Sequence, residues 1–162
     1  MASVAVISDT HMPRGSRALP RECLDVLARA DLILHAGDVT AAAVLELLRE
    51  LAPVQAVHRN MDEAELRADL PPTRVAEVAG ARVGMVHEPG PARGRHERLA
   101  AMFPDCTAVV YGHTHLPEVS RHAGVWMLNP GSPTERRRAP HRSMITLEIK
   151  AGEIVPALVR LL

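Results

Sequence analysis

Hydrophobic and polar positions alternate along the first half of the chain in two different patterns. Short apolar runs predict buried strands, and longer segments with apolar residues every three or four positions predict amphipathic helices. The expected strands cover residues 4–7, 31–36 and 54–57, and the expected helices cover 20–29, 41–51 and, as a short helix or turn, 63–70. Because strands and helices take turns, we expect βαβ units that build a parallel sheet.

The pattern changes after Pro71 and Pro72. Pairs of short strand-like segments follow, each pair joined at a glycine, as in β-hairpins. The pairs lie at 73–79 and 81–86, at 117–122 and 125–128, and at 144–149 and 154–159, and a helix at 96–102 and a buried strand at 106–110 separate the first two pairs. The sequence contains no internal repeat or linker, so we expect one α/β domain over residues 1–162.

Composition narrows the class of protein. Apolar residues make up 47% of the chain and aromatic residues only 2%, so the core must be aliphatic. The formal net charge of +0 gives no sign of stable nucleic-acid binding. Cys23 and Cys106 stand in apolar contexts without a C-x-x-C spacing, which predicts two buried free thiols. No secretory leader pattern and no apolar run near the ~18 residues of a membrane span is present, so we expect a cytoplasmic protein without membrane insertion.

Polar residues with metal-ligand chemistry follow the expected strands at their C-terminal ends. Open α/β sheets place their binding sites at this edge. The residues are Asp9, His11, Asp38, Asn60, His87, His113 and His115. Chance would place one such residue easily, but not all of them after five different strands.

Each residue alone also has an ordinary structural explanation. Asp9 is a frequent turn former, Asn60 suits a left-handed turn, and a His-x-His pair alone is typical of two surface or capped histidines. His35 lies within its strand, three residues before Asp38, and is expected to be packed and hydrogen-bonded rather than a ligand. The joint placement of the whole set is what favours a metal site.

Imidazole and carboxylate together form a ligand set that Mn, Fe or Zn accepts. The set divides into two triads. The triads are Asp9, His11 and His115, and Asn60, His87 and His113. Asp38 has two carboxylate oxygens and could bridge two ions, each of which would keep positions for water and substrate. Two ions roughly 3.5–4 Å apart suit chemistry at a phosphoryl centre.

The order of these motifs along the chain resembles that of the calcineurin-like metallophosphoesterases: Asp-x-His, Gly-Asp, Asn, His and Gly-His-x-His. The chain length and the runs 33–38, 111–115 and 129–132 are similar to the compact bacterial and archaeal phosphodiesterase branch. The resemblance covers nearly the whole chain. It implies two β-sheets packed face to face with helices outside, a four-layer αββα sandwich. It also implies two divalent metal ions, with Mn as the first choice and Ni, Fe or Zn as alternatives.

The resemblance further implies a phosphodiesterase in which a metal-bridging hydroxide attacks phosphorus. Asp38 would bridge the ions, and Asn60 and His113 would also hydrogen-bond the phosphoryl group. The substrate would be a small phosphodiester, with nucleotides among the candidates. Arg59 and Arg136 are the expected substrate contacts, although the run of three arginines that begins at Arg136 is also typical of a solvated loop.

The chain departs from the family pattern at three positions. The usual Gly-Asn-His-Asp/Glu motif is here Arg59-Asn60-Met61-Asp62. Arg59 leaves the backbone less free than glycine would, or lets a guanidinium reach the substrate. Met61 stands where many family phosphatases carry the histidine thought to protonate the leaving group, which disfavours phosphomonoesterase activity. Glu88 follows His87 where the branch often has glycine, and would either crowd the site or point to solvent.

Two other functions stay open. One is a phosphomonoesterase, which differs only in its substrate. The other is a catalytically weak scaffold: the retromer complex contains a subunit of this fold that has lost ligand residues and works through protein contacts. Here every ligand position is filled, and converging polar groups are costly without a cation, so the sequence favours the enzyme. A homo-oligomer is compatible with either function.

Overall fold

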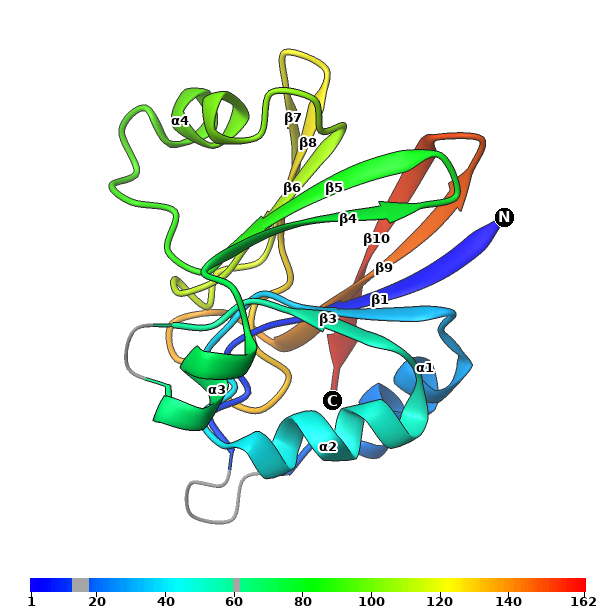
Figure 1. Ribbon diagram of the computed structural model, residues 1–162, viewed down its shortest axis with the longest axis vertical. Coiled ribbons are helices and arrows are strands. Elements are labelled where there is room, and N and C mark those ends of the chain that lie inside the picture. Colours follow the sequence, from blue (N-terminus) through cyan, green and yellow to red (C-terminus); the bar gives the residue numbers. More distant parts are fainter. Residues whose placement is uncertain (13–17, 60–61) are drawn as a thin grey trace.

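Two five-stranded β-sheets form the centre of the computed structural model, which describes residues 1–12, 18–59 and 62–162. The first sheet has the strand order β10-β9-β1-β2-β3 (Figure 1). Its strands are β1 (Ala2–Ile7), β2 (Leu32–His35), β3 (Val54–Ala56), β9 (Arg142–Lys150) and β10 (Glu153–Leu161). β2 is parallel to β1 and β3, as expected for βαβ units, and β9 is antiparallel to β1 and β10. The final hairpin thus extends the sheet that the N-terminal units begin.

The second sheet has the order β4-β5-β6-β8-β7. Its strands are β4 (Thr73–Val78), β5 (Ala81–Val86), β6 (Ala108–Tyr111), β7 (Glu118–His122) and β8 (Val125–Asn129). The two predicted hairpins are confirmed, and β6 lies between them, parallel to β5 and β8. β6 begins two residues later than predicted, because the Cys106 N–H donates to the Phe103 carbonyl in a turn (3.1 Å).

Alternation of side chains along the strands sorts the core into layers. Val6 and Leu34 of the first sheet lie in one buried cluster with Met85 and Val110 of the second. These residues fill the space between the sheets. The neighbouring positions of the same strands point outward, where helices cover them.

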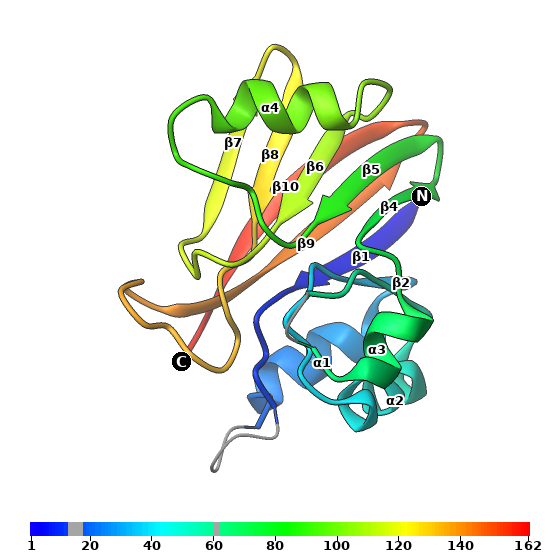
Figure 2. The same cartoon turned by 60° about the vertical axis from the view of Figure 1, so that its left-hand side comes forward.

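The helices lie on the outer faces of the two sheets (Figure 2). They are α1 (Arg21–Arg29), α2 (Ala42–Leu51), α3 (Ala64–Asp69) and α4 (Arg95–Met102). Leu27 of α1 and Leu48 of α2 pack in one cluster with Ile7, and Leu99 of α4 packs in another with Val109. The α3 helix joins α2 in a third cluster. The predicted four-layer arrangement, two packed sheets flanked by helices, is therefore confirmed.

Several smaller expectations have an outcome as well. Cys23 and Cys106 are buried and free, as predicted. None of the helices in the described ranges has the length and apolar character needed to cross a bilayer. Asn60 and Met61 lie outside the described residues. The assignment of residues 1–162 to one domain stays a prediction.

Candidate metal centre

Backbone hydrogen bonds join the loops that follow β1 and β2. The Asp9 N–H donates to the Gly37 carbonyl (3.0 Å), and the His11 N–H donates to the Asp38 carbonyl (3.3 Å). The two loops therefore run side by side beyond the ends of their strands. This pairing brings Asp9, His11 and Asp38 to one edge of the first sheet.

Five of the predicted ligands have a left-handed backbone, which residues other than glycine rarely adopt. They are Asp9 (φ 56°), His11 (φ 49°), Asp38 (φ 59°), His113 (φ 72°) and His115 (φ 60°). Such conformations persist only where surrounding contacts impose them, and they concentrate at functional sites. The loops after β1, β2 and β6 share this feature, so the convergence of their side chains is built into the backbone.

Within the described residues, two groups of side chains have ligand atoms close enough to hold a metal ion. The groups are Asp9, His11 and His115, and Asp9, Asp38 and His87, with the ligand atoms of each group within 4.8 Å of one another. All five residues are buried. The first group matches a predicted triad, and Asp9 belongs to both groups. That these side chains ligate a metal stays a prediction.

The remaining predicted ligands differ in position. His113 is exposed, and its ring stands edge-on to that of His87 with the ring centroids 5.5 Å apart. The backbone N–H of His113 donates to Asp9 Oδ2 (3.0 Å). His113 thus lies at the rim of the cluster rather than within either group. Asn60, the predicted partner of His87 and His113, falls outside the described residues.

Two histidines hold the tautomer that a metal requires. His87 Nδ1 lies 2.9 Å from the Ala36 carbonyl oxygen, and His115 Nδ1 lies 2.9 Å from the Glu135 carbonyl oxygen. Because a carbonyl only accepts, both Nδ1 atoms carry the proton, and each Nε2 keeps a lone pair. Metal-ligating histidines are usually oriented in this way by a backbone carbonyl.

Two buried acceptors in the cluster lack a hydrogen-bond partner among the described residues: Asp9 Oδ1 and His87 Nε2. They lie 3.8 Å apart. Burying polar atoms without a partner is costly, and two adjacent lone pairs are satisfied by a cation between them. The donor set and these unpaired atoms therefore fit a divalent metal.

Electrostatics inside the cluster are dominated by the two carboxylates. His11 Nε2 lies 2.9 Å from Asp38 Oδ2 and 3.2 Å from His115 Nε2. Burial lowers the pKa of His11, but the carboxylates of Asp38 and Asp9 outweigh it and raise this pKa to about 9. Burial raises the pKa of Asp9, yet the neighbouring imidazoles, those of His11 and His115 above all, hold it well below its usual range. A metal would thus meet two charged carboxylates and displace a proton from His11.

A polar network that the sequence did not predict supports the ligand loops. Ser132 Oγ donates to the Asp9 carbonyl (2.8 Å), Ser8 Oγ donates to Asp9 Oδ2 (2.7 Å), and Asn129 Nδ2 donates to Thr114 Oγ1 (2.9 Å). The only sequence signal was the run 129–132, noted for its resemblance to the family. The role of these residues becomes visible only in three dimensions.

Gly112 is required by close packing beside this network. A Cβ atom at Gly112 would overlap Ser8 Oγ and lie 2.7 Å from Asp9 Oδ2. Gly37 is required for a similar reason: its φ is +99°, and a Cβ there would lie 2.7 Å from His87 Cβ. The two glycines of the motifs thus leave room for ligands from other strands.

His35 is packed and hydrogen-bonded, as predicted. Its Nδ1 accepts from the Gly37 N–H (3.1 Å), so Nε2 carries the proton and donates to Thr10 Oγ1 (3.2 Å). Burial lowers the pKa of His35 to about 4. This neutral histidine links the two loops without joining either ligand group.

Two departures from the family pattern, Arg59 and Glu88, and the expected substrate contact Arg136 lie in different surroundings. Arg59 Nη1 donates to Asp38 Oδ2 at 3.0 Å. Glu88 is exposed. Arg136 is also exposed, and its Nη1 donates to the Ala139 carbonyl (3.1 Å) in its own turn, so substrate contact by Arg136 stays a prediction.

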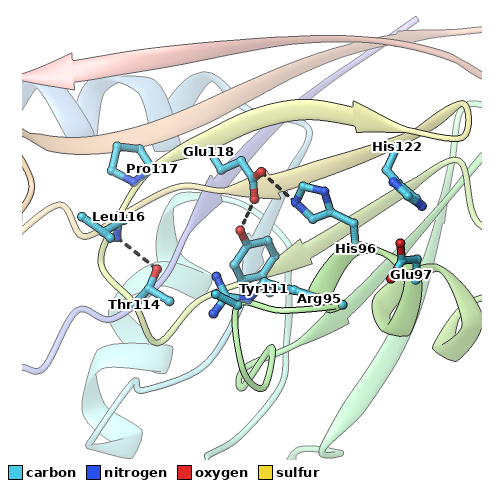
Figure 3. Close-up of a pocket in the computed structure, with 11 residues that line it drawn as sticks. Arg95, His96, Glu97, Tyr111, Thr114, Leu116, Pro117, Glu118 and His122 are labelled. Atoms are coloured by element: carbon cyan, nitrogen blue, oxygen red, sulfur yellow. Dashed lines mark hydrogen bonds and ion pairs between the residues drawn. The ribbon is translucent and has the colours of Figure 1, made fainter.

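The loop that carries His113 and His115, here called the ligand loop, also forms part of the wall of a cavity of about 450 Å³ (Figure 3). Thr114, which stands between His113 and His115, lines it together with Leu116. Glu118 is fixed in this cavity, because it accepts hydrogen bonds from His96 Nε2 (2.8 Å) and from the hydroxyl of Tyr111. The cavity therefore combines a fixed carboxylate with an apolar rim.

Residues 2–152 match the calcineurin-like phosphoesterase superfamily domain. The chain belongs to this superfamily. It is 35% identical over 159 residues to a probable metallophosphoesterase of Methanothermobacter thermautotrophicus, and the match covers 97% of this chain and 91% of the relative. Its described residues include two groups that could hold a metal ion, which together with the named relative supports a metal-dependent phosphoesterase.

Solved structures show the same fold. A Thermotoga maritima protein, TM1076, aligns with a TM-score of 0.78 at 32% identity and covers 99% of this chain and 100% of its own. Vps29 of Entamoeba histolytica in complex with Zn²⁺ aligns with a TM-score of 0.78 at 28% identity and covers 98% of both chains. The fold of this chain is therefore shared with a Vps29 protein that was solved with Zn²⁺.

Proposed function

We propose that this phosphoesterase-family protein is a dinuclear metal-dependent phosphodiesterase, with Mn²⁺ as the ion that supports hydrolysis in vitro. The observation that carries the proposal is the pair of ligand groups that share Asp9, with unpaired Asp9 Oδ1 and His87 Nε2 facing each other. When bound, two divalent ions supply an activated water and neutralise charge on the phosphoryl oxygens.

The ligand assignment follows the sequence prediction. Asp9, His11 and His115 hold one ion, and His87 with His113 and Asn60 holds the other. Asp38 is proposed as the bridge because its Oδ2 lies 2.9 Å from His11 of one group while Asp38 itself belongs to the group of His87. Asp9 contributes to both groups as well.

His113 and Asn60 are proposed to contact the phosphoryl group. Burial and the neighbouring His87 lower the pKa of His113, so its imidazole is neutral near pH 7. With Nε2 or Nδ1 protonated, an exposed neutral imidazole at the rim can donate one hydrogen bond to a phosphoryl oxygen. Arg59 and Arg136 are proposed as further substrate contacts.

The cavity beside Thr114 is proposed to receive the organic substituent of the diester. Thr114 belongs to the ligand loop, and Arg95 and His96 on the opposite wall follow the loop that begins at His87. A substituent bound there would meet the fixed carboxylate of Glu118 and the apolar side chain of Leu116. Small phosphodiesters with a polar, hydroxyl-bearing group, nucleotides among them, fit this lining.

The test has two parts. Elemental analysis of protein reconstituted with Mn²⁺ is expected to give two ions per chain. Hydrolysis of aryl diesters and cyclic nucleotides is then compared with Mn, Ni, Fe and Zn. Anomalous scattering from crystals of the reconstituted protein locates the ions. If it shows no metal at Asp38, the enzyme proposal is wrong.

The scaffold alternative remains the second candidate, because Vps29 structures share the fold over nearly the whole chain. Vps29 was solved in complex with Zn²⁺, so metal content alone does not separate the two functions. A hydrolysis assay separates the two functions. If the metal-loaded protein cleaves no phosphate ester, the scaffold that acts through protein–protein contacts is favoured.

A further inference from the structure

Arg59 lies directly on the carboxylate that is proposed to bridge the two ions. Its Nη1 is 3.0 Å from Asp38 Oδ2, and the exposed fractions of the two side chains are 28% and 8%. The same oxygen also lies 2.9 Å from His11 Nε2. One carboxylate oxygen therefore lies within 3.0 Å of two nitrogen atoms, one from His11 and one from Arg59.

The position of Arg59 is fixed by the backbone around it. Buried Asp62 accepts from the Arg59 N–H through Oδ2 (2.8 Å) and from the Thr40 N–H through Oδ1 (3.1 Å). Asp62 thereby ties the loop after β3 to the loop that carries Asp38. The contact between Arg59 and Asp38 follows from this loop pairing and does not depend on a mobile surface side chain.

An oxygen of a carboxylate has two in-plane lone pairs, and two nitrogen atoms lie within 3.0 Å of Asp38 Oδ2. An ion in the first group would engage His11 Nε2 and so remove His11 from Asp38. An ion in the second group needs Asp38 itself, and therefore meets the Arg59 guanidinium that already lies on this carboxylate. His11 is itself a ligand of the first group, whereas Arg59 lies beside a ligand of the second group and has no lone pair with which to bind a metal.

We propose that Arg59 acts as a built-in cation that weakens binding of the second divalent ion, so that the two metal sites fill at different concentrations. This inference rests on the proposed dinuclear site. It assigns to Arg59 a function at the metal centre that precedes substrate binding. Release of Arg59 from Asp38 accompanies occupation of the second site.

The test is an isothermal calorimetric titration of the metal-free full-length protein with Mn²⁺. The wild-type protein is expected to show two binding steps of different affinity. Arg59→Met keeps an unbranched, flexible side chain but removes the charge, and should tighten the second step about tenfold or more, the scale of one close charge pair. The first step should stay within about threefold, since the ion pair of Arg59 is with Asp38 of the second group and not with Asp9, the carboxylate of the first group.

Two matched variants control for charge. Arg59→Lys keeps the cation and should keep two separate steps. Arg67→Gln removes an exposed arginine of α3 and should leave both steps unchanged. An unchanged second step in Arg59→Met, with two ions still bound, would overturn this inference alone. Failure of every variant to bind Mn²⁺ would overturn the dinuclear proposal and this inference with it.

Discussion

His87 Nδ1 donates to the carbonyl oxygen of Ala36 across 2.9 Å. The donor follows a strand of the second sheet and the acceptor follows a strand of the first, so this bond fixes a ligand of one sheet to the backbone of the other. It also fixes the tautomer, which leaves Nε2 free for a metal. The candidate metal centre is therefore tied to the packing between the two sheets.

Asp38→Asn should abolish most of the hydrolytic activity. The substitution keeps the size of the side chain but removes the charge that lets two oxygens bind two cations. We expect kcat/KM with Mn²⁺ to fall by orders of magnitude, while the circular dichroism spectrum stays that of the wild type. Turnover like that of the wild type in Asp38→Asn would show that Asp38 is not the bridge.

Gly37→Ala should damage both the fold and the metal centre. At φ +99° any Cβ is strained, at a cost of about 1–2 kcal/mol, and this Cβ would also press on the His87 ring. Gly124→Ala is the matched control, because Gly124 has φ +81° but nothing described within 4 Å of its Cβ position. Denaturant titration should show a larger loss for Gly37→Ala, and only Gly37→Ala should lower Mn²⁺ stoichiometry. Equal losses and equal metal content would contradict the proposed contact.

Much of the fold was predictable because burial leaves a regular trace in the sequence. Val6 and Leu34 face the other sheet while Ile7 and Ile33 face the helices, and runs that are apolar on both faces identify such strands. The same logic placed candidate ligands at strand ends. The strand order β4-β5-β6-β8-β7 was not predictable, since parallel pairing of β6 with β8 leaves no local pattern.

Five of the predicted ligands come together in the two groups, but the way in which they group was not predictable. The sequence assigned Asp9 to one triad, whereas the structure brings Asp9 into both groups. That outcome depends on the left-handed backbone at Asp9 and Asp38, and no residue type at these positions signals it. Support from Ser132 was equally hidden, because 123 positions separate it from Asp9.

Buried His35 should make the protein less stable in mild acid. Its pKa is about 4 in the folded protein, from an ordinary value of 6.5, because burial disfavours the charged form. Below pH 6.5 the unfolded chain takes up a proton that the folded chain refuses, so the free energy of unfolding falls as pH drops from 6.5 to 4. A shift of this size corresponds to roughly 3 kcal/mol.

The measurement is urea unfolding of metal-free protein between pH 4 and 7. His35→Gln should flatten the slope, although His113, whose pKa is also lowered, keeps part of it. His141→Gln, at an exposed histidine, is the control and should keep the full slope. The raised pKa of His11 acts in another window, because its contribution is complete below pH 6.5 and is lost toward pH 9. If His35→Gln shows the same slope as the wild type, His35 is not the cause of the loss of stability in mild acid.

Filling the cavity beside the ligand loop should affect substrate binding more than chemistry. Leu116 is 45% exposed at the rim, and Leu116→Trp would occupy space meant for the organic substituent. We expect KM for bulky diesters to rise several-fold with little change in kcat. Leu47→Trp, at a similarly exposed position (40%) on α2, is the control. A fall in kcat without a change in KM would argue against a substituent pocket.

The last prediction concerns the class of ester. Expelling a poor leaving group from a phosphate monoester benefits from a positioned acid, which is typically worth about 10²–10⁴-fold. Met61 has no titratable proton at the position where many family phosphatases carry a histidine. A diester with an aryloxide or a strained cyclic alkoxide as leaving group depends less on that acid. We therefore expect kcat/KM for aryl diesters to exceed that for aryl monoesters with the same metal.

Met61→His tests whether this one position sets the preference. The variant should raise monoester turnover while diester turnover changes little, because only the monoester reaction lacks the acid. His58 and His96 are other histidines that could supply a proton, but His96 Nε2 is engaged with Glu118 (2.8 Å). His96→Gln should therefore leave the ratio of diester to monoester turnover unchanged. A strong monoester preference in the wild-type protein would refute the phosphodiesterase proposal, and it would place the acid outside position 61.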